Sequence, residues 1–144
     1  MNMKYGNIHI IGPKKFQDQT ILALGFIKKK SKEDFNKVNK YLKEIKFSEI
    51  SYMDVEKSVF YVGEKNVFNT LEWYASAIIH DTHHYYLHKI EEIPWKKGNM
   101  TKHETLCIKE QVRFFKKIKA PEDLIKYTKA AVKKKHWFSK KRNW

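Results

Sequence analysis

The chain has 144 residues and is 42% hydrophobic, so it is long enough to form one domain whose core needs no disulfide or metal to hold it together. Its one cysteine, Cys107, excludes an internal disulfide framework and favours a reducing compartment, so we expect a cytoplasmic protein. The formal net charge of +14 would attract nucleic acid or an anionic membrane, but arginine, the residue best suited to phosphate recognition, occurs only as Arg113 and Arg142. The charge permits such partners without identifying them.

The sequence contains no sign of membrane insertion, secretion or a second domain. No apolar run approaches the roughly 18 residues of a transmembrane helix, and the N-terminal MNMKYGNIHII lacks the apolar segment of a signal peptide. There is no internal repeat or linker. We therefore expect one domain, residues 1–132, followed by a basic, aromatic tail, residues 133–144.

The N-terminal third of the chain predicts one strand and two helices. Residues Tyr5–Ile11 are rich in β-branched side chains and predict a strand that ends before Gly12 and Pro13. Apolar residues at helical spacing predict a first helix over Phe16–Lys28. Ser31 is a suitable N-cap for a second helix. The apolar stripe of that helix consists of Phe35, Val38, Leu42 and Ile45.

The middle of the chain predicts a β-hairpin followed by a helix. Ile50–Met53 and Val59–Val62 have the composition of two strands joined by a turn. Asn69, with Glu72 three residues later, can cap a helix that extends to about Lys89.

The C-terminal part predicts a connector over Ile93–Asn99, a helix over Thr101–Lys119 and a last helix that begins at Pro121. The expected fold is therefore α+β: a mainly helical single domain in which a small antiparallel sheet packs on about five helices.

Histidines are concentrated in one apolar segment, Trp73–His88 (WYASAIIHDTHHYYLH). His80 and His84 are four residues apart, which places both imidazoles on one face of a helix, close enough to bind one metal ion. The alternative is that both are core histidines held by hydrogen bonds to backbone or carboxylate groups. His83 points away from this face, and we expect it to be a surface or packing residue.

A third ligand would have to come from another element, and Glu104 is the best candidate. It belongs to an apolar stripe, so its carboxylate faces the core and needs a compensating cation. The alternative is a capping box in which Glu104 bonds the backbone of Thr101. On the same stripe, we expect Gln111 to support the ligands and Cys107 to be a small buried side chain near the metal. His103 is assigned no role.

The sequence HDTHH, followed after nineteen residues by Glu104, resembles the gluzincin arrangement of zinc metallopeptidases. The wider text, ASAIIHDTHH and then ETLCIKEQ, is similar to small bacterial zincin-like proteins. This resemblance implies that His80, His84 and Glu104 bind Zn²⁺ and that a metal-activated water hydrolyses a peptide or amide bond. Zincins have glutamate directly after the first histidine, and this chain has Asp81, which would then be the general base.

The tail supplies the alternative function. It places Trp137, Phe138 and Trp144 among lysines, a composition suited to stacking on single-stranded nucleic acid. In that case the protein would be a basic nucleic-acid-binding or interaction protein, and its metal site would be structural or inactive.

Overall fold

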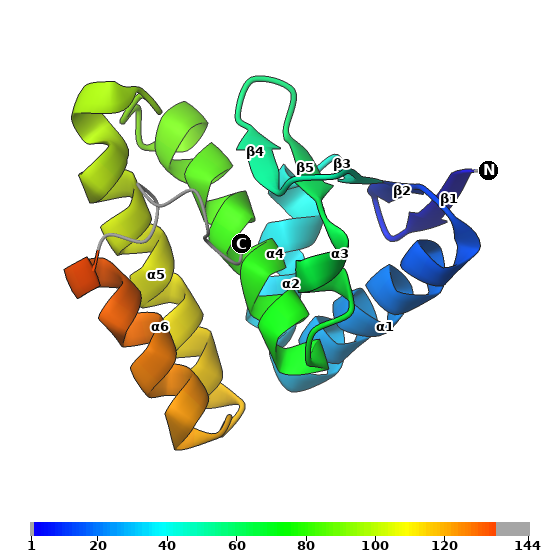
Figure 1. Cartoon of the computed structure of the whole chain (residues 1–144). Helices are drawn as coiled ribbons and strands as arrows, with labels where there is room; N and C mark the ends of the chain where they lie inside the picture. Colours follow the sequence, from blue (N-terminus) through cyan, green and yellow to red (C-terminus); the bar gives the residue numbers. More distant parts are fainter. Residues whose placement is uncertain (1, 135–144) are drawn as a thin grey trace.

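The computed structural model describes residues 2–134 of the chain (Figure 1). The strands are β1 (Asn2–Tyr5), β2 (Ile8–Ile11), β3 (Glu44–Phe47), β4 (Tyr52–Asp54) and β5 (Val59–Val62). The α-helices are α1 (Lys14–Lys30), α2 (Lys32–Tyr41), α3 (Glu64–Val67), α4 (Leu71–Tyr85), α5 (Met100–Lys117) and α6 (Glu122–Lys134). A π-helical segment, Tyr86–Ile90, continues α4, and a short 3-10 helix, Lys97–Asn99, precedes α5.

The α+β class is confirmed, but the sheet is mixed, where an antiparallel sheet was predicted. Its strand order is β1-β2-β3-β5-β4. The two outer pairs are antiparallel, and of these only the β4–β5 hairpin was predicted, whereas β2–β3 and β3–β5 are parallel. Parallel pairing follows from the connection between β2 and β3, because α1 and α2 return the chain to the same end of the sheet.

In the N-terminal third, two predictions were wrong: the single strand, and the C-terminal end of the second helix, which does begin after the predicted N-cap Ser31. The predicted strand over Tyr5–Ile11 is a hairpin, in which Gly6 takes a positive φ of 58° and the Asn7 amide donates to Asn39 Oδ1 at 2.7 Å. The second helix ends at Tyr41, so Ile45 lies in the central strand β3 and is fully buried. A stripe at helical spacing cannot reveal this strand, because its buried position depends on pairing with β2 and β5.

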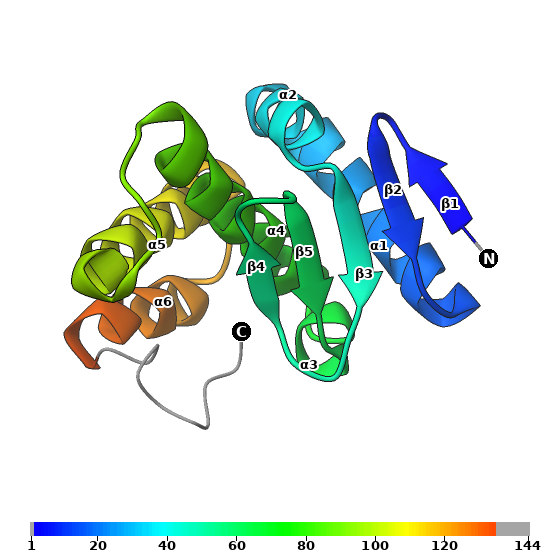
Figure 2. The same cartoon turned by 90° about the horizontal axis from the view of Figure 1, so that it is seen from above.

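The histidine-bearing helix α4 is the centre of the molecule. In Figures 1 and 2 it lies between the α5–α6 pair and the layer of α1 and α2 that covers one face of the sheet. Every residue from Trp73 to Thr82 is accordingly buried. Fully buried Tyr74 joins α4 to α1 through a 2.6 Å hydrogen bond with Thr20. A buried phenol needs such a partner, so this contact fixes the position of α4 against α1.

The ends of two predicted elements differ slightly from the structure. The N-cap of α4 is Thr70, whose hydroxyl accepts from the Trp73 amide at 3.2 Å, and predicted Asn69 instead accepts from the Thr70 amide at 2.7 Å. Helix α6 extends to Lys134, two residues into the predicted tail, and residues 135–144 of that tail lie outside the described residues. Within the described part, no helix has the length and apolar character to cross a membrane.

Candidate metal centre

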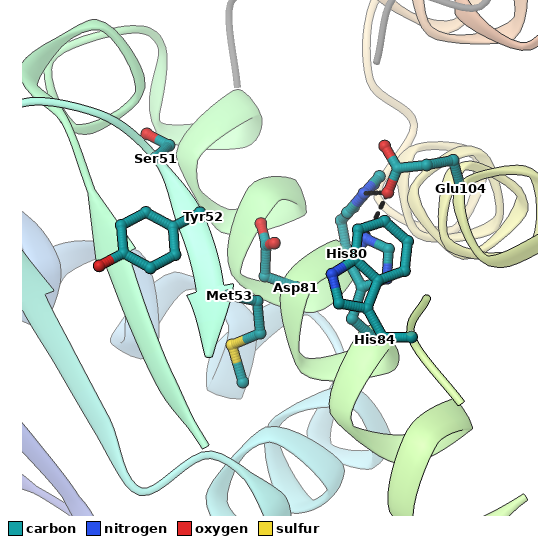
Figure 3. Close-up of a pocket in the computed structure, with 8 residues that line it drawn as sticks. Ser51, Tyr52, Met53, His80, Asp81, His84 and Glu104 are labelled. Atoms are coloured by element: carbon teal, nitrogen blue, oxygen red, sulfur yellow. Dashed lines mark hydrogen bonds and ion pairs between the residues drawn. The ribbon is translucent and has the colours of Figure 1, made fainter. Parts of the chain in front are cut away.

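The three predicted ligands come together between α4 and α5. Glu104 Oε1 lies 3.3 Å from His80 Nε2 and also contacts His84 Nε2 (Figure 3). Each of the three residues is at most 4% exposed. Because the spacing of four residues places both imidazoles on one face of α4, with ring centroids 5.0 Å apart, one carboxylate from α5 reaches both.

The helix α5 turns Glu104 toward the histidines and away from its own N-terminus. The helix begins at Met100 with Asn99 as its N-cap, so Thr101 is not in the capping position, and no side chain of residues 2–134 caps this end. The capping-box alternative for Glu104 is therefore wrong. Glu104 lies instead on the buried face of α5.

A hydrogen-bonded chain stands behind His80. Its Nδ1 lies 2.6 Å from Gln111 Oε1, Gln111 Nε2 donates to Ser76 Oγ at 3.0 Å, and Ser76 Oγ donates to the Trp73 carbonyl at 2.8 Å. Ser76 donates its hydroxyl proton to a carbonyl, so it can only accept from Gln111. The Gln111 amide must therefore turn its nitrogen to Ser76 and its oxygen to His80. His80 Nδ1 is therefore the donor, and His80 Nε2 faces Glu104.

A second chain stands behind His84, and it contains a residue that sequence reasoning missed. His84 Nδ1 lies 3.1 Å from Nδ1 of fully buried His103, and His103 Nε2 donates to the Ile93 carbonyl at 2.6 Å. One signal for His103 was present: a step of four residues back from Cys107 reaches it, so it shares the buried stripe of α5.

The Cys107 side chain is closer to the histidines than its expected packing role requires. Ligand atoms of His80, His84 and Cys107 all lie within 4.8 Å of one another, and all three residues are buried. This group can therefore hold a metal ion. Burial raises the pKa of the Cys107 thiol well above its usual value, so the sulfur keeps its proton unless a cation replaces it.

The electrostatics of the cluster are those of a buried carboxylate between two imidazoles. Burial raises the pKa of Glu104, but the two histidines outweigh this and hold it below its usual value. Burial alone would lower the pKa of His80, and Glu104 raises it above the ordinary value. For His84 burial dominates and lowers the pKa to about 4. Without a metal, an additional proton on the cluster is therefore favoured on His80 over His84.

The neutral pair His84 and His103 has too few protons for its contacts. Three contacts in a row join the Ile93 carbonyl, His103, His84 and the Glu104 carboxylate. Each of the three contacts needs one proton. The carbonyl and the carboxylate supply none, and the two neutral imidazoles supply one each, so one contact has no proton. Burial lowers the pKa of His103 as well, which disfavours an additional proton. A cation bound at His84 Nε2 would take the place of the one missing proton, between this nitrogen and the Glu104 carboxylate.

The Glu104 carboxylate has a second unmet requirement. Its Oε2 atom is buried and has no hydrogen-bond partner within residues 2–134. An unpaired buried carboxylate oxygen is costly, and a bound cation removes that cost. The donor set of two imidazoles, a carboxylate and a neighbouring thiol suits a divalent first-row metal ion.

The cluster faces a pocket of about 210 Å³. Figure 3 shows Asp81 on α4 between the histidines and the β4 segment, and Asp81 lines this pocket together with all three predicted ligands. Trp95, from the connector before α5, lines it too, with its ring 4.6 Å from that of His84. No sequence signal pointed to Trp95, because its position depends on how the connector folds back over α4.

The remaining histidines of α4 and its extension lie away from the cluster. His83 Nδ1 is 2.7 Å from Lys37 Nζ, in a part-buried contact between α4 and α2. His88 bonds Glu56 at 2.6 Å and accepts from the Trp95 amide at 2.9 Å.

Comparisons with known proteins identify no relative: no family model, curated protein or solved structure matches the chain.

Proposed function

We propose that this protein is a zinc-dependent hydrolase of the zincin type. His80, His84 and Glu104 bind Zn²⁺, and Asp81 acts as the general base. The observation that carries the proposal is the meeting of two imidazole Nε2 atoms with a buried carboxylate whose second oxygen has no partner among the described residues. Two histidines and one carboxylate are a common ligand set of catalytic zinc sites, in which water occupies an open position.

The proposed chemistry divides between the metal and Asp81. A bound zinc ion supplies Lewis acidity and lowers the pKa of a coordinated water to about 7. Asp81 lines the same pocket as the ligands, so its carboxylate can accept the proton of the attacking water and return it to the leaving amine. Its side chain is one methylene shorter than the glutamate of zincins, so we expect a slow enzyme.

The substrate class follows from the resemblance of HDTHH and Glu104 to gluzincins, which implies a peptide or amide bond. The pocket supports a substrate at this position because the cluster is accessible from it, while each ligand remains buried. The wall of the pocket includes Met53 and Trp95, which offer apolar contact to a substrate side chain.

The decisive experiment is elemental analysis of protein purified without a histidine tag. We expect about one zinc per chain, lost in the double variant His80→Ala/His84→Ala. His83→Ala is the matched control, since His83 lies on α4 itself but contacts Lys37, outside the cluster. A wild-type chain that binds no zinc when it is supplied, or a double variant that keeps it, contradicts the proposal. Zinc-loaded protein would then be screened against peptide and amide substrates, with the double variant as the blank.

A further inference from the structure

We propose that His103 is a positioning residue of the metal centre. It accepts a hydrogen bond from His84 Nδ1 and so fixes the ring orientation in which His84 Nε2 binds the metal. This inference rests on the proposed function, because it requires His84 to be a ligand. It goes further by assigning a role to a histidine that would not itself touch the metal.

The direction of each hydrogen bond follows from the metal-bound state. A histidine that binds metal through Nε2 is neutral there and carries its proton on Nδ1. His84 must then donate to the atom opposite its Nδ1, which is His103 Nδ1 at 3.1 Å. His103 accepts with that nitrogen and keeps its own proton on Nε2, where the Ile93 carbonyl accepts it at 2.6 Å. Each of the four ring nitrogens of His84 and His103 then has a partner of the correct kind.

The packing around His103 holds this arrangement in place. The rings of His84 and His103 are parallel to within 11°, with centroids 5.3 Å apart. Trp95 packs against both, with centroids 4.6 Å from His84 and 5.0 Å from His103. His103 is fully buried, so its ring cannot turn without displacing these neighbours.

The two nitrogens of His103 make separable contacts. Nδ1 faces the ligand His84, and Nε2 holds the connector through Ile93. An asparagine amide can place its oxygen near the position of Nδ1, and a glutamine amide can place its nitrogen near the position of Nε2. His103→Asn therefore keeps an acceptor for His84, and His103→Gln keeps a donor for Ile93. If His103 positions the ligand, His103→Asn should bind zinc more tightly than His103→Gln. If His103 only holds the connector, the order of the two zinc affinities should be reversed.

The experiment measures the affinity of each full-length variant for Zn²⁺ by competition with a chromophoric chelator, and for Co²⁺ by absorption. We expect His103→Gln and His103→Phe to bind both ions about 10- to 100-fold more weakly, the usual effect of losing a partner behind a ligand. We expect His103→Asn to stay closer to the wild type. Circular dichroism and thermal unfolding of the metal-free variants establish that each has folded.

A spectroscopic readout separates positioning from general stability. In long-range ¹H–¹⁵N spectra of the zinc-loaded protein, we expect a protected Nδ1 proton on His84 in the wild type and in His103→Asn. This signal should be lost in folded His103→Gln and His103→Phe. Zinc affinity equal to that of the wild type in folded His103→Gln, or weaker binding by His103→Asn than by His103→Gln, would overturn the role of His103 and leave the zinc site intact. A wild-type chain without zinc would instead remove the proposed function, and this inference with it.

Discussion

Glu104 Oε1 lies 3.3 Å from His80 Nε2, although 24 positions separate the two residues in the chain. The contact is possible because α4 and α5 run side by side and the connector between them returns the chain along the same face (Figure 1). Both side chains are at most 3% exposed, so neither group can be satisfied by bulk water. The cluster must therefore meet its requirements with a proton or a metal ion.

The first prediction concerns Glu104→Gln. This variant keeps the size of the side chain but removes the charge that attracts a cation, so we expect zinc content to fall from about one per chain to near zero. The matched control is Glu110→Gln on the same helix, because Glu110 bonds Arg113 at 3.0 Å and lies outside the cluster. Elemental analysis after dialysis provides the comparison. Equal zinc in Glu104→Gln and the wild type would show that another residue completes the site.

The second prediction concerns Asp81→Asn. An amide cannot accept a proton from water, so we expect unchanged zinc content and a loss of hydrolysis of about 10²-fold or more. Asp81→Glu introduces the residue of zincins at this position, and we expect it to retain activity or raise it. The initial rate on the best substrate of the screen is the measurement. Full activity in Asp81→Asn would assign the proton transfer to another group.

The third prediction concerns Cys107→Ser. If Glu104 is the third ligand, this substitution leaves the zinc stoichiometry unchanged, and the Co²⁺-loaded wild type lacks the intense near-ultraviolet absorption of a thiolate ligand. The Cys107 sulfur lies within 4.8 Å of the histidine ligand atoms, so it is close enough to compete with Glu104 as the third ligand. A thiolate band in the wild type that disappears in Cys107→Ser would place the sulfur in the coordination shell, and a shell closed by four protein ligands is typical of a structural site.

The fourth prediction concerns pH and the metal-free protein. Burial, assisted by the charge of Lys37, lowers the pKa of His83 to about 3. The unfolded chain takes up this proton near pH 6.5 and the folded chain does not, so the free energy of unfolding falls as the pH drops from about 6.5 toward 3. The contribution of this one residue is at most about 1.4 kcal/mol per pH unit.

The test compares urea unfolding of wild type and His83→Asn between pH 7 and pH 5 in the presence of a chelator. Asparagine keeps an acceptor for Lys37 and does not titrate, so we expect a shallower fall in the variant. The comparison removes the opposite contribution of His80, whose raised pKa stabilises the fold below pH 6.5 and loses that effect as the pH rises. Identical slopes in the two proteins would mean that His83 is protonated normally in the folded state.

Some features of the site could be derived from local pattern alone. The four-residue spacing of His80 and His84 depends only on the geometry of a helix, and the stripe of α5 indicated that Glu104 and Gln111 face the core. Gln111 does lie behind His80, at 2.6 Å from its Nδ1. The role of these residues as zinc ligands and ligand support stays a prediction, which metal analysis will decide.

Other features are contacts between elements that are far apart in the sequence, and no local pattern indicated those contacts. Ile45 continued the stripe of α2 in the sequence, yet it lies in β3, because a central strand takes its buried position from the neighbours on both sides. His103 and Trp95 reach His84 only because the connector folds back over α4.

Periodicities of a few residues were enough to predict the α+β class, the amphipathic helices and the shared face of His80 and His84. The folded structure was needed to reveal the mixed order of the sheet, the position of Glu104 between the two imidazoles and the hydrogen-bonded chain through His103. Those depend on how separate elements dock, and docking is determined by the packing of whole surfaces, which no short stretch of sequence contains.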